Sequence, residues 1–379
     1  MNNYKIILSS VIAALALSAC GGDTTPTEPT NPDNPTISRC PAGTPNIILD
    51  NDNFDPDWLP TLIGAINMDQ NCEINLLGVI VNGTNTYQKA GIMYSTVLSY
   101  YDIQDRVPLG VVNDRPQRTT PTKATSDNPP KDGAYKGTHS NITEFPSDEL
   151  LDNNRPGAAE VICEILENAN GKVDYVTGGH LTGLQAFLEG NHCDAISLTK
   201  SKINKFVFGT GYDDRHEGTA EMNFSEGRYN VETAASKSAN YVMNKLNAEA
   251  SDVQIHLPSD HWNWDDAKVY RMGDQYKEDK HLDSPMSFVY SIYTYGVWGD
   301  HGAGDSLAVL YSSGITKVAG VQTGTRQVCI TLNPVDARIN IKDSTDCNHW
   351  VGTYNSNVGG YVGQKITQAI ESPTASGKI

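Results

Sequence analysis

Short apolar runs alternate along this chain with longer segments in which apolar residues recur every three or four positions. The first pairs are "NIILD" with "WLPTLIGAI" and "INLLGVIV" with "YQKAGIMYSTVLSYY". Continuous apolar runs are typical of strands that helices cover on both faces, and their alternation with helices indicates β-α-β units. The pattern therefore predicts an α/β fold with a mostly parallel central sheet flanked by helices.

The alternation resumes after a polar stretch over 115–153 that is rich in Pro, Thr, Asp and Asn, which we interpret as an excursion over the surface. The later predicted elements are a helix in "RPGAAEVICEILENA", a strand in "VDYVT", a helix in "LTGLQAFLEG", a strand in "KFVFGT", a helix over 231–246, a strand in "VQIHL" and helices in "GDSLAVLYSSG" and "YVGQKITQAIES". No second linker or repeat interrupts the sequence, so we predict one domain over 40–371 and a flexible tail over 372–379.

The N-terminus has the features of an export signal. Its apolar stretch over 6–17 is too short to span a bilayer, and the small residues Ser18 and Ala19 precede Cys20. The sequence "LSAC" resembles a bacterial lipobox, which predicts a lipoprotein signal peptide over 1–19 and a lipid on Cys20. An ordinary cleaved signal peptide is the alternative.

Residues 20–39 are rich in Pro and Thr and nearly free of apolar side chains, so we expect them to form a flexible or extended tether. The domain would then be exported and held to a membrane through the lipid on Cys20. Gly21 stands where an aspartate is often linked to retention in the inner membrane. We therefore expect the outer membrane, with the domain facing the periplasm or the cell surface.

The number of cysteines indicates disulfides, and the net charge excludes one class of partner. After Cys20, six cysteines remain, an even number that favours disulfides in an exported chain over metal thiolates or a catalytic thiol. Six cysteines allow about fifteen pairings. Proximity in the sequence suggests Cys40 with Cys72, Cys163 with Cys193, and Cys329 with Cys347.

The formal net charge of −17 argues against nucleic acid as a partner, because phosphate binding needs clustered Lys and Arg.

Four aspartates, Asp50, Asp52, Asp55 and Asp57, follow the first predicted strand directly. In open α/β sheets ligands bind at the carboxyl ends of the strands, which is where these residues fall. Four carboxylates so close together repel one another unless a cation lies among them or some are protonated. Oxygen ligands at alternate positions suit a hard divalent ion such as Ca²⁺ or Mg²⁺. An Asp- and Asn-rich turn with helix-capping residues is the plain structural alternative.

Two enzyme classes place aspartates in this way. In phosphatases of the haloacid dehalogenase class, Asp50 would be the nucleophile and Asp52 the general acid, with Asp265 and Asp266 as later metal ligands. In the nucleoside hydrolase family, the motif D-x-D-P-G-x-D-D follows the first strand. The stretch "DNDNFDPD" resembles that motif, although Pro56 stands where the first of the paired aspartates is expected.

Further segments resemble the nucleoside hydrolase family, in the same order along the chain. They are "LLGVIVNGTN" with Asn85, "VDYVTGGHLTGL" with Thr177, "GTAEMNFSEG" with Glu221 and Asn223, and "GDSLAVLYSSG" with Asp305. The phosphatase interpretation explains only the first motif, and no segment supplies a convincing lysine for the phosphate. The resemblance implies a single Rossmann-like domain with the nucleoside hydrolase fold.

The resemblance also implies a function, namely calcium-dependent hydrolysis of the N-glycosidic bond of ribonucleosides, or of a related N-riboside, to free base and ribose. Ca²⁺ would be bound by Asp52, Asp57, Asp305 and the carbonyl of Thr177. Asp52 would also be the general base that takes a proton from the attacking water. Asp50 would lie just outside the metal ligands and orient them.

The sugar and the base would be held by residues from other segments. Asn85, Glu221 and Asn223 would bind the ribose, and Asp55 could bind the sugar hydroxyl in place of the aspartate that Pro56 replaces. The regions that would contact the base contain His301, Trp262 and Trp298.

A relative that binds ribose or a nucleoside with little or no catalysis is the alternative from another class. Gly304 stands where some family members carry the histidine that protonates the leaving base, and Pro56 is the other departure. Both favour this alternative.

Overall fold

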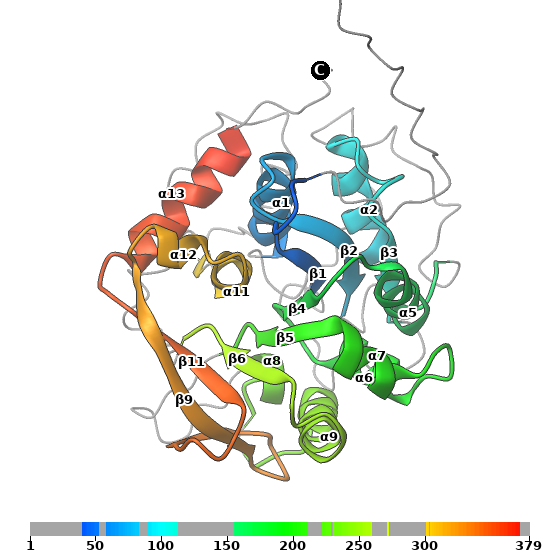
Figure 1. Cartoon of the computed structure of the whole chain (residues 1–379), viewed down its shortest axis with the longest axis vertical. Helices are drawn as coiled ribbons and strands as arrows, with labels where there is room; N and C mark the ends of the chain where they lie inside the picture. The colour runs from blue at the N-terminus through cyan, green and yellow to red at the C-terminus, as the bar shows by residue number, and fades with distance from the viewer. Residues whose placement is uncertain are drawn as a thin grey trace, which may run out of the picture. The chain divides into compact units, whose positions relative to one another are not determined.

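A nine-stranded sheet runs through the computed structural model in the order β10-β9-β11-β6-β5-β4-β1-β2-β3 (Figure 1). The structure describes residues 40–52, 58–82, 90–112, 155–210, 222–228, 230–259, 271–272, 301–302 and 304–371. The strands of this sheet are β1 (Asn46–Asn51), β2 (Asn75–Val81), β3 (Leu109–Val111), β4 (Val173–Thr177), β5 (Ile203–Phe208), β6 (Gln254–Leu257), β9 (Gln322–Leu332), β10 (Ile339–Asp343) and β11 (His349–Tyr354). Neighbouring strands are parallel from β3 across to β11, and β9 and β10 are antiparallel, so the predicted α/β class with a mostly parallel sheet is confirmed.

Helices cover both faces of the sheet, as its apolar strands require. They are α1 (Trp58–Gln70), α2 (Ala90–Tyr100), α5 (Ala158–Asn168), α6 (Thr182–Glu189), α7 (Ala195–Lys202), α8 (Met222–Ser225), α9 (Ala234–Glu249), α11 (Gly304–Ser312), α12 (Ile315–Val318) and α13 (Val358–Glu371). One apolar cluster joins the sheet to α1, α2, α11 and α13, and the other joins it to α5, α6 and α9. Figure 1 shows these two groups of helices on opposite sides of the sheet.

The helices and strands predicted from the apolar pattern are present, with small shifts at their ends. Helix α9, for example, begins at Ala234 because Thr233 caps it. The Thr233 side chain accepts a hydrogen bond from the Ser236 backbone, and the Ser236 side chain accepts one from the Thr233 backbone. Such reciprocal capping satisfies backbone N–H groups that otherwise have no partner in the first turn.

Three disulfides are present, and they join Cys40 to Cys72, Cys163 to Cys193 and Cys329 to Cys347. The pairing predicted from proximity in the sequence is therefore confirmed. Each bridge closes a loop of 18 to 32 residues, which restricts the unfolded chain and so favours the folded one.

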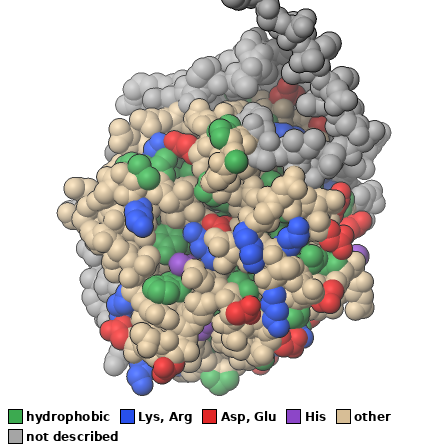
Figure 2. Space-filling view, viewed as in Figure 1, with side chains coloured by type: hydrophobic (Ala, Val, Ile, Leu, Met, Phe, Trp, Pro, Cys, Tyr) green, Lys and Arg blue, Asp and Glu red, His purple; other side chains and the backbone are tan. Residues whose placement is uncertain are grey.

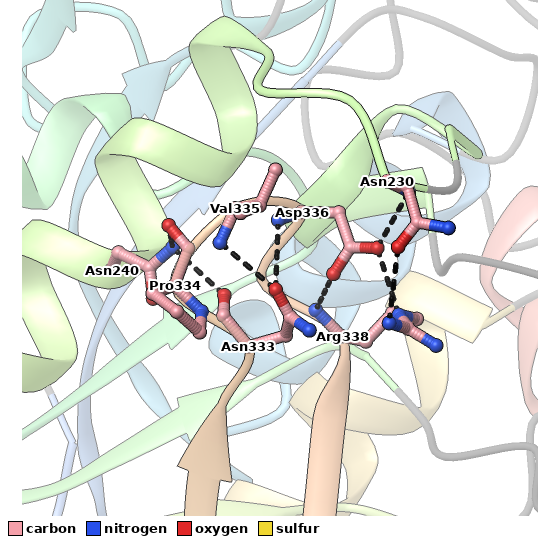
Figure 3. Close-up of polar contacts among 7 residues, drawn as sticks. All are labelled: Asn230, Asn240, Asn333, Pro334, Val335, Asp336 and Arg338. Atoms are coloured by element: carbon pink, nitrogen blue, oxygen red, sulfur yellow. Dashed lines mark hydrogen bonds and ion pairs between the residues drawn. The ribbon is translucent and has the colours of Figure 1, made fainter.

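An unpredicted part of the fold is the antiparallel extension formed by β9 and β10, whose connecting turn is tied to the loop between α8 and α9 (Figure 3). Asp336 is fully buried and accepts hydrogen bonds from the Arg338 Nε at 2.8 Å and from the Asn230 backbone N–H at 2.7 Å. Asn333 accepts two backbone hydrogen bonds within the turn, and Asn240 donates from α9 to the Asn333 carbonyl at 3.1 Å. We call Asn230, Asn240, Asn333, Asp336 and Arg338 the hairpin clamp.

The surface carries charges of both signs on the face seen in Figure 2, where Lys and Arg side chains share the view with Asp and Glu. Within the described residues, no helix is long and apolar enough to cross a membrane. Cys20 and the tether lie outside the described residues, so the predicted lipid anchor stays a prediction.

Candidate functional site

The predicted strand-end residues meet where β1, β2 and β4 finish side by side. Asp50 and Asn51 are the last two residues of β1, and Asp52 follows them. In the sheet register Asp50 lies opposite Thr177, the last residue of β4, and Asn51 lies opposite the last residue of β2. Asn82 comes directly after β2, and its backbone N–H donates to the Asn51 carbonyl at 3.0 Å. Polar residues from three strands are therefore gathered at one edge of the sheet.

Asp50 is fully buried at this edge and is held by neutral donors. The Tyr175 hydroxyl donates to its Oδ2 at 2.5 Å, and Asn82 Nδ2 donates to its Oδ1. Burial raises the pKa of Asp50 to about 7, and hydrogen bonds from Tyr175, Asn82 and the Leu184 backbone oppose that rise. These donors fix the carboxyl group in one orientation.

Two glycines after β4 allow the chain to turn tightly against the other strand ends. A methyl group on Gly178 would lie 2.4 Å from Asn51 Oδ1 and 2.5 Å from Asp305 Cγ. A methyl group on Gly179 would lie 2.4 Å from Asn82 Oδ1 and 2.7 Å from Asp52 Cβ. No side chain fits at either position, and the short turn brings Asp52 and Asp305 close to the same backbone.

Asp305 reaches this site from the first turn of α11, more than 250 residues after Asp50 in the sequence. It is buried, and the next residue, Ser306, shares a 2.8 Å hydrogen bond with Thr61 of α1. That bond ties the start of α11 to the helix that follows β1. The structure thus brings Asp305 next to Gly178 at the strand ends, and its predicted role as a metal ligand stays a prediction.

Asp52 is buried, and its position is fixed through its own backbone. The Tyr94 hydroxyl of α2 donates to the Asp52 carbonyl, and the ring of Tyr94 stacks on Trp58 at a centroid distance of 4.6 Å. Trp58 in turn accepts a hydrogen bond from Asn51 at its carbonyl, at 3.2 Å. The first residues of α1 and the side of α2 therefore hold the end of β1 in place.

Thr177 and Asn223 join the ends of β4 and β5. The Thr177 carbonyl, which the sequence predicts as a metal ligand, accepts a hydrogen bond from the Gly209 N–H at 2.5 Å. Asn223 is buried in α8, and its Nδ2 donates to the Gly209 carbonyl at 2.7 Å and to the Gly178 carbonyl at 3.4 Å. Asn223 thus lies beside Gly178 and Gly209, with its amino group on the backbone of both turns, and its predicted contact with the ribose stays a prediction.

The oxygen atoms gathered here fit a hard cation. The side-chain oxygens of Asn51 and Asn82 are buried and have no hydrogen-bond partner in the part of the chain that the structure describes. They flank the turn that also contacts Asp52 and Asp305. All these groups would bind a metal through oxygen atoms, the type of ligand that Ca²⁺ prefers. Among the described residues no three His, Cys, Asp or Glu side chains form a metal cluster, and Asp57, the third predicted carboxylate, lies outside them.

Several predicted site residues lie outside the described residues, and their roles stay predictions. These are Asp55, Asp57, Asn85, Glu221, Trp262 and Trp298. His301 is described only through its backbone, which forms the short strand β8 (His301–Gly302) and pairs with Met272 in β7 (Arg271–Met272).

Four residues that sequence reasoning did not select belong to the site, namely Asn51, Asn82, Tyr94 and Tyr175. Asn82 carries the same positional signal as Asp52, because it comes directly after an apolar strand. Tyr175 carries no such signal, since it lies within an apolar strand and only its hydroxyl reaches Asp50.

No family model matches the sequence, and no curated protein matches it either. Solved structures do match its fold. The inosine-uridine preferring nucleoside hydrolase from Bacillus anthracis is 14% identical, with a TM-score of 0.55, covering 86% of this chain and 99% of that one. An inosine-guanosine nucleoside hydrolase is 16% identical, with a TM-score of 0.58, covering 86% of this chain and 100% of that one.

A type III effector protein, XopQ, complexed with adenosine diphosphate ribose, also matches. It is 12% identical, with a TM-score of 0.52, covering 87% of this chain and 93% of that one. The chain therefore has the nucleoside hydrolase fold, and the resemblance stated from the sequence motifs is confirmed at the level of the fold.

Proposed function

We propose that this protein is a calcium-dependent hydrolase that cleaves the N-glycosidic bond of ribonucleosides, or of a related N-riboside, to free base and ribose. The observation that carries this proposal is the meeting of Asp50, Asp52, Thr177, Asn223 and Asp305 at one edge of the sheet. Nucleoside hydrolase motifs select these five residues from segments far apart in the sequence, and the fold is the one those motifs imply.

The reaction needs a water to attack C1′ of the ribose while the C1′–N bond breaks and its electron pair leaves with the base. In this proposal Asp52 takes the proton from the attacking water as the general base. The leaving base takes up a proton from solvent, which balances the proton that Asp52 removes, and His301, Trp262 and Trp298 are the proposed contacts to the base. Asn223 supports the ribose site through the turns that it bridges, together with Asn85, Glu221 and Asp55.

Ca²⁺ would be held by Asp52, Asp57, Asp305 and the Thr177 carbonyl, and it would bind the ribose hydroxyls and spread the charge that develops on the sugar. Asp50, held by Tyr175 and Asn82, would keep the neighbouring ligands in their orientation.

The proposed place of action is outside the inner membrane, with the domain attached through a lipid on Cys20. The three disulfides support an oxidising compartment, because such bonds are rare in reducing cytosol. The signal over 1–19 and the tether over 20–39 support the lipid anchor.

The test is release of free base from inosine, uridine, guanosine and adenosine by the purified protein, with calcium and with a chelator. We expect release that needs calcium, and the rates on the four substrates give the base preference. Release that the chelator leaves unchanged would disprove calcium dependence. No release from any of the four substrates would disprove hydrolysis of these ribonucleosides.

A second candidate is a ribose- or nucleoside-binding protein with little catalysis. Pro56 and Gly304 favour it, since both stand where the family motif has side chains that act on the substrate. The match to an effector protein that was solved with adenosine diphosphate ribose also supports a binding role. Binding of a nucleoside by calorimetry without base release would favour this candidate.

A further inference from the structure

Asn51 presents a buried oxygen that the fold of the chain does not use. Its side chain is fully buried, and its Nδ2 donates to the Trp58 carbonyl at 3.2 Å. Because Nδ2 faces a carbonyl acceptor, the amide cannot be turned round without setting two oxygens against each other. Its Oδ1 therefore faces Gly178, and within the described residues no donor reaches it.

Asn82 shows the same arrangement on the next strand. It is buried, and its Nδ2 donates to the Asp50 carboxyl group, which again fixes the orientation of the amide. Its Oδ1 faces Gly179 and has no hydrogen-bond partner in the described part of the chain. Leaving one buried acceptor unpaired costs about 1–3 kcal/mol, so two of them facing consecutive glycines of one turn favour a ligand at this point.

The carboxyl groups close to these oxygens identify the kind of ligand. Asn51 Oδ1 and the Asp305 carboxyl group lie against the same glycine, and Asn82 Oδ1 and Asp52 lie against the next one. Carbonyl oxygens beside carboxylates carry like partial charge, which only a cation or a donor between them can relieve. Ca²⁺ accepts six to eight oxygens, including Asn side-chain carbonyls, whereas a site built for transition metals uses His or Cys.

We propose that the side-chain oxygens of Asn51 and Asn82 bind the calcium ion directly, beside Asp52 and Asp305. This inference rests on the proposed function and names ligands that its motif does not. Neutral amide oxygens would fill the metal shell of a site in which Pro56 replaces an aspartate of the motif. The ion would then be held by fewer negative charges and by more neutral oxygens.

The first test is calorimetric titration of the purified protein and its variants with Ca²⁺. We expect Asn82→Leu and Asn51→Leu each to weaken calcium binding by about tenfold or more, because each removes one metal–oxygen bond. Asn75→Leu is the matched control. Asn75 is a buried asparagine at the other end of β2, and its Nδ2 donates to the Thr44 carbonyl and to Asn46. Its replacement should leave calcium affinity within about twofold.

The second test counts the water molecules on the ion, which a purely structural role of the asparagines would not change. Tb³⁺ replaces Ca²⁺, and its luminescence lifetimes in H₂O and D₂O report the number of bound waters. Each leucine variant should gain roughly one water where the amide oxygen was removed. Asn51→Ala removes the oxygen with a smaller side chain, so it should also gain roughly one water.

The outcomes separate this inference from the proposed function. Unchanged affinity and water count in both leucine variants, with binding abolished in Asp52→Ala and Asp305→Ala, would overturn the inference and leave the calcium site standing. If a leucine variant does not fold, the smaller replacement Asn51→Ala decides through its count of bound waters, because an unchanged count contradicts a direct bond. A wild-type protein that binds neither Ca²⁺ nor Tb³⁺ would overturn the inference together with the calcium dependence of the proposed function.

Discussion

Two clusters of aspartate and asparagine among the described residues differ in how completely their buried polar atoms are paired. In the hairpin clamp, the Asp336 carboxylate is matched by the charge of Arg338 and by backbone N–H groups. At the strand ends, Asp50 receives only neutral donors, and the oxygens of Asn51 and Asn82 receive none from the described residues.

This difference is the one expected between a cluster that serves the fold and a cluster that binds a ligand. Buried polar groups that serve only the fold are normally hydrogen-bonded, because an unpaired one lowers stability. The clamp follows that rule and fastens β9 and β10 to the loop before α9. The strand-end cluster departs from it at the side-chain oxygens of Asn51 and Asn82, which is expected where the missing partner is a ligand.

The largest expected effect is on calcium binding at the strand ends. Asp52→Ala and Asp305→Ala should each weaken Ca²⁺ binding by about a hundredfold or more, since each removes a charged ligand. Base release should fall with the loss of bound metal. Calorimetric titration and inductively coupled plasma analysis measure the first effect, and a variant that keeps stoichiometric calcium would show that its aspartate is not a ligand.

Changes in the hairpin clamp should lower the stability of the fold and leave calcium binding unchanged. Asp336→Ala removes the acceptor of the Arg338 Nε and of the Asn230 N–H, and we expect a loss of about 2–4 kcal/mol in the free energy of unfolding. Calcium affinity should stay as in the wild type. Urea denaturation measures the first quantity and calorimetry the second.

The control for the clamp lies on the same hairpin. Arg326 and Asp343 form an exposed ion pair there, so Asp343→Ala should cost less than about 1 kcal/mol. If Asp336→Ala cost as little as Asp343→Ala, the clamp would not be the attachment that its contacts indicate.

Much of the fold could be predicted because the strands near β1 are buried on both faces and read as apolar runs. The strands β9 and β10 could not, since the burial of β9 alternates and "QTGTRQVCITL" carries polar residues at most positions. Strand β3 is only three residues long, and α7 has few apolar residues, so neither leaves a clear pattern.

Some residues of the candidate site could also be predicted from the sequence, and others could not. Asp50, Asp52 and Asp305 could be predicted because charged residues at strand ends and at a helix start are conspicuous. Asn82 and Tyr175 could not, because an asparagine after a strand is also a common turn residue and the Tyr175 ring belongs to an apolar strand. Their part in the site depends on pairing between distant strands, which a single sequence does not reveal.

A smaller effect should follow the removal of one donor to Asp50. Tyr175→Phe removes the hydroxyl that donates to Oδ2, and we expect the free energy of unfolding to fall by about 1–2 kcal/mol. Tyr175→Phe combined with Asn82→Leu should differ from the sum of the single changes, because both side chains donate to the same carboxyl group. Urea denaturation of the four proteins measures this coupling, and simple additivity would contradict a shared role.

The last prediction concerns the buried side chain of His256. Its replacement should change the free energy of unfolding least at neutral pH and more as the pH falls. Its Nδ1 lies 2.7 Å from the Tyr311 hydroxyl and its Nε2 lies 2.9 Å from Gln254 Oε1. Burial and the nearby charge of Lys205 lower the pKa of His256 to about 3. An unfolded imidazole takes up a proton near its ordinary pKa, about 6.5, so between these two values the unfolded chain binds more protons than the folded one.

Stability should therefore fall as the pH falls through this window, by up to about 1.4 kcal/mol per pH unit from His256 alone. His256→Gln removes this contribution, so its unfolding free energy should vary less steeply with pH than that of the wild type. His192→Gln, which removes an exposed imidazole, is the control and should follow the wild type. Urea denaturation from pH 7 to pH 4 gives the slopes, and equal slopes for His256→Gln and the wild type would mean that His256 takes up its proton in the folded protein too. A steeper slope in the wild type would show that His256 must stay neutral in the folded protein. The three groups would then differ in kind: we propose that a cation completes the strand-end site, whereas Arg338 completes the hairpin clamp and His256 is paired only as a neutral imidazole.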